Sequence, residues 1–114
     1  MNLWTKPKVC GEIPLSGRHG HSACEFKKNL IIFGGEQNFN TTLNIRECLN
    51  DLRIFNPEKN EWKYVQTLSQ QQINARRNHT AAIHERFMYV YAGISKEGHY
   101  LKDLWTLHLS KNPI

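Results

Sequence analysis

The side chains that could do chemistry in this chain are histidines, which bind metals and transfer protons, and aspartates, which act as acids or bases. Two of the six histidines, His21 and His79, occupy matching positions in two similar segments, and Asp51 and Asp103 do the same. A single metal or catalytic site has no need of its residues in duplicate. The other histidines show no spacing typical of metal ligands: His19, His84, His99 and His108. The sequence therefore predicts a repeated structural role for these groups, with no metal, no cofactor and no catalytic residue.

The remaining reactive groups also point away from catalysis. The three cysteines, Cys10, Cys24 and Cys48, lack C-x-x-C spacing and are odd in number, which predicts reduced thiols and a cytoplasmic location. The net charge of +5 is spread along the chain, and the only basic doublets lie at 27–28 and 76–77. This pattern favours a solvated surface over a nucleic-acid-binding stripe. No apolar run reaches about 18 residues, so the sequence predicts no membrane span.

Two similar segments lie 58 positions apart in the chain. A fixed period of this size marks a repeat architecture, in which one unit cannot bury its apolar face alone and stacks on its neighbours. The segments that match at 58 positions are RHGHSA (18–23) with RRNHTA (76–81), IIFGG (31–35) with YVYAG (89–93), and Trp4 with Trp62. LNDLRI (49–54) matches LKDLWT (101–106) at 52 positions, because the connection before it is six residues longer in the first repeat.

The elements that must position these residues are short strands, because apolar residues alternate or run in short stretches. One repeat is predicted to be a four-stranded antiparallel meander. The expected strands are 23–26, 30–33, 49–55 and 62–65 in the first repeat, and 80–83, 87–91 and 103–109 in the second.

R-x-x-H-S-A, an apolar run ending in Gly-Gly, L-N-D-L and a Trp eleven residues after the Asp resemble the kelch repeat of β-propellers, from about Trp4 to Leu109. The resemblance implies an all-β fold: a β-propeller segment of about two four-stranded antiparallel kelch blades, incomplete as a closed ring. The second repeat departs from the motif at Ala92 and Lys102. The motif positions, expected to serve the fold, are Arg18, His21, Gly34, Gly35, Asp51, Trp62, Arg76, His79, Gly93 and Asp103.

The boundaries of the repeats do not coincide with the ends of the sequence. Residues 1–17 are expected to form the outer strand of a preceding blade and an inter-blade loop, 18–65 a complete repeat, and 66–114 a repeat that lacks its outer strand. Two interpretations follow. The chain is a piece of a larger propeller, or the first strand of one chain completes the last blade of another and three chains close a six-bladed ring.

Strand direction places further residues. Strands one and three of a meander start at the same end, so we expect each Asp of the motif to pair with an Arg of its own blade or of the next. Six aromatic residues are expected to pack between adjacent sheets: Phe33, Phe55, Trp62, Tyr89, Tyr91 and Trp105.

The same argument puts four long connections on one face: 5–17, 36–48, 66–75 and 94–100. The connection 36–48 is six residues longer than its counterpart and carries Phe39, Leu43 and Ile45, which either contact a partner or tuck against the blade. The predicted function is a protein–protein interaction module, of adaptor or scaffold type, that binds a protein through this face; the alternative is a fragment of a kelch-propeller enzyme such as an oxidase or a sugar-processing enzyme. The candidate partner-binding residues are Asn38, Phe39, Asn40, Leu43, Arg46, Arg76 and Arg77.

Overall fold

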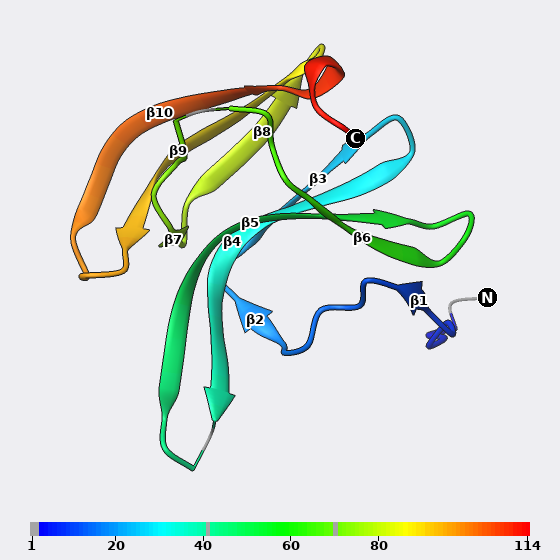
Figure 1. The fold of residues 1–114 in the computed structure, drawn as a ribbon, viewed down its shortest axis with the longest axis horizontal. Coiled ribbons are helices and arrows are strands. Elements are labelled where there is room, and N and C mark those ends of the chain that lie inside the picture. The colour runs from blue at the N-terminus through cyan, green and yellow to red at the C-terminus, as the bar shows by residue number, and fades with distance from the viewer. Residues whose placement is uncertain (1–2, 41, 70) are drawn as a thin grey trace.

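The apolar runs of the first repeat form an antiparallel meander, because their side chains alternate in polarity and short turns join them. The computed structural model describes residues 3–40, 42–69 and 71–114, and it places this meander in a first sheet (Figure 1). The strands of the first sheet are β1 (Cys10–Gly11), β2 (Arg18–His19), β3 (Ser22–Phe26), β4 (Asn29–Asn40), β5 (Ile45–Asn56) and β6 (Glu61–Val65). Strands β3 to β6 pair in chain order, β2 extends beside β4, and β1 pairs in parallel with β6.

The second repeat forms a second sheet of the same design. Its strands are β7 (Arg76–Arg77), β8 (Thr80–His84), β9 (Phe87–Ser95) and β10 (Tyr100–His108), and the short 3-10 helix η1 (Leu109–Lys111) follows. Strands β8 to β10 pair antiparallel, and β7 extends beside β9. Within the described residues no strand pairs with the outer edge of β10, the place that β6 takes beside β5. The prediction of an all-β fold is confirmed.

The two sheets meet face to face across one apolar layer. Ile31 and Phe33 of β4 and their neighbours on β5 face Met88 and Val90 of β9, and all of these side chains are buried. Trp105 and Leu107 of β10 are partly buried against the same layer. Since one face of each sheet is used in this contact, the other face of each sheet is turned outward.

The prediction that six aromatic residues pack between the sheets needs correction for four of them, Phe55, Trp62, Tyr89 and Tyr91. Tyr91 is 52% exposed, because it alternates with the buried Val90 and therefore lies on the outward face of the second sheet. Phe55 and Trp62 contact each other, with ring centroids 5.0 Å apart, on the outward face of the first sheet. Of the six aromatic residues, Phe33 and Trp105 are the two that pack against the layer between the sheets.

The glycine pair, Gly34-Gly35 in the first sheet and Ala92-Gly93 in the second, has two separate functions. We call β2 and its match β7 the inner strands of their sheets. At Gly35 (φ +95°) an added Cβ would lie 2.7 Å from the carbonyl oxygen of His19, so the second position of the pair faces the inner strand of its own sheet. At Gly34 an added Cβ would lie 2.9 Å from the carbonyl oxygen of Arg76, which belongs to the neighbouring sheet. Ala92 also has a positive φ, of 61°, but no sheet covers its face, so its methyl group has room.

The connection predicted at 36–48 is mostly strand, and strands also include both ends of the connection predicted at 94–100; this is a correction. After an irregularity at the glycine pair, β4 and β5 continue their pairing as far as Asn40 and Ile45, and β9 reaches Ser95. The polar composition of these segments hid the strands, since backbone hydrogen bonds form a ladder without an apolar face. The six extra residues therefore lengthen a hairpin instead of a loop. We call residues 36–48 the β4–β5 hairpin (Figure 1).

The segment before the first sheet has no strand at residues 3–9, and the side chain of Trp4 is fully exposed. The outer strand expected around Trp4, and the division at residues 17 and 65, stay predictions.

Candidate functional site

Each sheet contains one arginine–aspartate pair in the same place. Arg18 donates two hydrogen bonds to Asp51, at 2.8 and 3.0 Å, and Arg76 donates two to Asp103, at 2.7 and 2.9 Å. Each arginine also donates to the carbonyl oxygen of the first residue of its glycine pair, at 3.1 and 2.9 Å. The two alternatives are thus resolved: each aspartate pairs within its own sheet, and the pair ties the inner strand to the second and third strands.

A further donor completes each pair, and it differs between the sheets. Arg53 donates from Nε to Oδ2 of Asp51 at 2.9 Å, whereas Trp105, at the matching position, donates from its indole Nε1 to Oδ2 of Asp103 at 2.7 Å. Comparison of LRI (52–54) with LWT (104–106) does not predict this common donor, because Arg53 and Trp105 share an N–H group but differ in residue type. The repeat preserves a hydrogen-bond donor.

These donors set the charge of both carboxylates. Burial would raise the pKa of Asp51, but the hydrogen bonds from Arg18 and Arg53 outweigh it, and the pKa is lowered. The hydrogen bonds from Arg76, with a smaller contribution from Trp105, hold the pKa of Asp103 well below its ordinary range. Both aspartates are therefore ionised at neutral pH.

The pairs predict how stability depends on pH. A carboxylate with a lowered pKa stabilises the fold above its unfolded pKa, and this stabilisation is lost as the pH falls toward the folded value. We expect the free energy of unfolding to decrease from about pH 5 to about pH 2. In the double variant Asp51→Asn, Asp103→Asn it should be lower at pH 7 and change less with pH, as measured by urea unfolding. Glu58→Gln, in an exposed turn, is the control, and an equal pH slope in all three proteins would contradict the assignment.

His79 joins the two sheets. Its Nε2 lies 2.9 Å from Oγ of Ser22, and its ring packs edge-on against Phe33. Burial, with the nearby charge of Arg76, lowers the pKa of His79, so the imidazole is neutral. His21, the matching residue, lies beside Ile32 on the outward face of the first sheet. These positions fit a structural role for both histidines.

Glu36 is the centre of a charged cluster at the base of the β4–β5 hairpin. The carboxylate is almost completely buried and lies 3.4 Å from Arg46, 3.3 Å from Arg77 and 3.5 Å from His19. Because Arg77 comes from the second sheet, this cluster fixes the hairpin to both sheets. The sequence analysis did not single out Glu36, since its only signal is a lone acidic residue after the glycine pair.

The candidate partner-binding residues fall into three groups. Leu43 and Arg46 are exposed on the hairpin, and Arg77 is partly exposed at its base. Asn38 lies in β4 and is half-buried, while the side chains of Phe39 and Asn40 lie outside what the structure describes. Arg76 is completely buried, so the prediction that it contacts a partner is wrong; its guanidinium is enclosed by its own sheet.

The apolar residues of the hairpin tip are not tucked against the sheet. Leu43 is 66% exposed and Ile45 is 48% exposed. Ser16, in the connection before β2, donates to the carbonyl oxygen of Asn38 at 3.3 Å and ties this connection to the hairpin. The hairpin therefore presents two apolar side chains and the cation of Arg46 to solvent.

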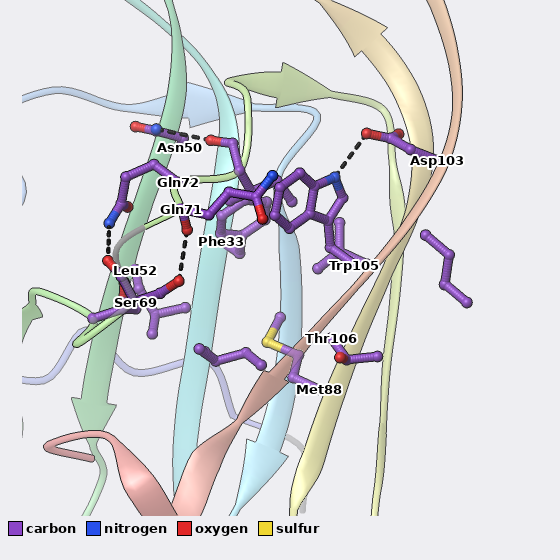
Figure 2. A pocket seen from close by; sticks show the side chains of 15 residues that line it. Phe33, Asn50, Leu52, Ser69, Gln71, Gln72, Met88, Asp103, Trp105 and Thr106 are labelled. Carbon is purple, nitrogen blue, oxygen red and sulfur yellow. Dashed lines mark hydrogen bonds between the residues drawn. The ribbon is translucent and has the colours of Figure 1, made fainter.

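A cavity of about 580 Å³ lies between the sheets on the side of β10 (Figure 2). Leu52 of the first sheet and Met88, Trp105 and Leu107 of the second form its apolar walls. The connection between the sheets covers it with polar side chains, among them those of Ser69, Gln71 and Gln72.

Three observations bear on other kinds of site. Within residues 3–40, 42–69 and 71–114, no group of three or more histidine, cysteine, aspartate or glutamate side chains is placed to hold a metal ion. The three cysteines are free. Among the same residues, no helix is long and apolar enough to cross a membrane.

Comparison with known proteins agrees with the geometry. The family model of the KLHDC2/KLHL20/DRC7 Kelch-repeats domain matches residues 1–113. Host cell factor of Drosophila melanogaster is 31% identical over 95% of the chain, and kelch domain-containing protein 3 of Bos taurus is 31% identical over 79%. Acyl-CoA-binding domain-containing protein 4 of Arabidopsis thaliana is 31% identical over 95%.

The chain spans only part of these proteins: 8% of host cell factor, 22% of kelch domain-containing protein 3 and 16% of the acyl-CoA-binding protein. Among solved structures, YjhT matches 74% of the chain with a TM-score of 0.59, at 23% identity and over 23% of its own length. The two sheets, with the free edge of β10, fit an incomplete β-propeller and confirm the predicted fold class. The chain therefore belongs to the kelch-repeat family.

Proposed function

We propose that this chain is a protein-interaction module, of adaptor or scaffold type, that binds a protein partner through the β4–β5 hairpin. Kelch-repeat domains are generally protein-interaction modules. The observation that carries the proposal is the exposure of Leu43 and Ile45 at the tip of a hairpin that is six residues longer than its counterpart in the second sheet. Apolar side chains held in solvent on a rigid scaffold are typical of a contact surface.

The partner surface proposed here combines apolar and basic contacts. Leu43 and Ile45 supply the apolar centre, and Arg46 lies next to Ile45 with its side chain 55% exposed. Arg46 is held by Nε at 3.2 Å from Oδ1 of Asn44 and by its contact with Glu36, which fixes its direction before binding. The three free cysteines support the predicted cytoplasmic location.

Peptide selection tests the hairpin without knowledge of the partner. We expect peptides selected on the wild-type chain from a phage-displayed random library to bind the double variant Leu43→Ser, Ile45→Ser about tenfold more weakly or worse, because apolar anchors carry most of the binding energy. Arg46→Ala should weaken the same peptides to a smaller extent. Affinities are measured by calorimetry on purified proteins.

Leu68→Ser is the matched control, since Leu68 is also an exposed leucine but lies in the connection between the sheets. It should leave the affinities unchanged. Peptides that bind the wild type and the hairpin variant equally well would refute the proposed site.

A further inference from the structure

We propose that the second sheet binds a second copy of this chain: the first sheet of that copy packs on the outward face, and its segment around Trp4 lies along the free edge of β10. The association is head-to-tail. It rests on surfaces apart from the hairpin, so it stands or falls independently of the proposed function.

The outward face of the second sheet matches a surface that is already an interface in this chain. Tyr91 and Leu104 occupy the positions of Phe33 and Leu52, which are 5% and 4% exposed because the second sheet covers them. Tyr91 and Leu104 themselves are 52% and 61% exposed. The face is thus built to be covered by a sheet.

The covering sheet is also present in the chain. Met88 and Val90 make the contact from the second sheet, and their matches in the first sheet are Leu30 and Ile32. Leu30 is exposed and Ile32 is half-buried on the outward face of the first sheet. A second copy therefore brings the apolar surface that the uncovered face requires, in the same repeat register.

Polar contacts can be repeated at the same junction. The imidazole of His79 contacts the hydroxyl of Ser22 between the sheets; across the new interface the imidazole of His21 would meet the hydroxyl of Thr80. The amide of Asn78 donates to the carbonyl oxygen of Gly20 at 2.8 Å, and these two residues are themselves a matched pair. The copy's Gly20 amide can therefore donate to the Asn78 carbonyl oxygen.

The strand that the second sheet lacks is supplied by the same copy. Trp62 pairs with Phe55 in the first sheet, and the match of Phe55 in the second sheet is Leu107, which lines the cavity beside β10. The copy's Trp4, fully exposed and outside any strand, would pair there and place its indole in the cavity.

The spacing allows both contacts at once. Trp62 precedes the inner strand of the next sheet, at Arg76, by 14 positions, and Trp4 precedes Arg18 by 14. To make the contact, the segment leaves its two-residue pairing of β1 with β6.

Light scattering on the full chain tests the association. We expect the wild type to form one discrete oligomer at micromolar concentration. Trp4→Glu and Leu104→Glu should each weaken the association by about tenfold or more, with circular dichroism like that of the wild type. Leu43→Glu, at an exposed leucine of the β4–β5 hairpin and away from both proposed contact surfaces, is the matched control and should associate as the wild type does.

Mixing the two variants gives a sharper result. Each retains one competent surface, so Trp4→Glu and Leu104→Glu together should form a 1:1 heterodimer, which non-specific apolar aggregation would not produce. Ala92→Gly should strengthen association, because Gly34 at the matching position admits the neighbouring sheet. A monomeric wild type, or variants that assemble as it does, would overturn the proposal and leave the face to a sheet from another polypeptide.

Discussion

Arg76→Ala is expected to lower the free energy of unfolding by about 3 kcal/mol or more, the largest effect of any single side-chain truncation in the chain. Arg76 is completely buried and donates to Asp103, to the carbonyl oxygen of Ala92 and to that of Asn74. Its removal leaves a cavity, two carbonyl oxygens without this donor and a carboxylate without its cation. Urea unfolding at pH 7 measures the change.

Arg77→Ala is the control, because the two arginines are adjacent but bonded differently. Arg77 makes one longer contact, 3.3 Å to Glu36, from a partly exposed side chain, so its loss should cost roughly 1 kcal/mol or less. Arg76→Lys should be intermediate, since an ammonium keeps the charge but cannot make the paired hydrogen bonds. Equal losses for Arg76→Ala and Arg77→Ala would contradict the structural role of the buried pair.

Gly35→Ala is expected to destabilise the fold by about 3 kcal/mol, through two additive causes. At φ +95° an L-residue is strained, and the new methyl group would lie 2.7 Å from the carbonyl oxygen of His19 and 3.0 Å from the Cβ of His21. Neither neighbour moves freely, because His19 pairs with Glu36 of β4 and His21 lies between β2 and β3, which both pair with β4.

Two other glycines separate the causes. Gly98 has a φ of +86° but open space around its Cβ position, so Gly98→Ala should show the backbone cost alone, about 1 kcal/mol. Gly17 has neither a positive φ nor a close neighbour, so Gly17→Ala should be nearly neutral. Thermal and urea unfolding of the three variants must rank Gly35 above Gly98 above Gly17, and any other order would refute the assignment of close packing at Gly35.

Much of the fold was predictable because most of the strand patterns occur in both repeats. The apolar alternation predicted seven strands. Equal strand direction predicted that each aspartate pairs with an arginine of its own blade or of the next, and the structure shows the pairs Arg18–Asp51 and Arg76–Asp103 within each sheet. Strand ends were not predictable from polarity, since β4 and β5 continue through polar residues on backbone hydrogen bonds alone. The prediction that Tyr91 packs between the sheets was wrong, because an aromatic residue at this position does not reveal whether another sheet covers that face.

The candidate site was predictable in place but not in detail. The extra length before β5 located the hairpin, whereas the exposure of Leu43 and Ile45 depends on where the strands end. Glu36 was not predicted because its three neighbours, His19, Arg46 and Arg77, come from β2, β5 and β7, which only the fold brings together. The burial of Arg76 was not predicted either, because its partners Ala92 and Asp103 lie on β9 and β10 and are brought together only by the fold.

The polar contacts between the sheets are confined to one side. The Asn78–Gly20, His79–Ser22 and Arg77–Glu36 contacts all involve the inner strands or their immediate neighbours, whereas the cavity lies at the outer strand β10. Directional bonds resist separation where they lie, and apolar contacts around an unfilled space resist it less. The two sheets are therefore held together most strongly beside their inner strands. We expect them to separate most readily at the edge of β10, so that the angle between the sheets widens on that side.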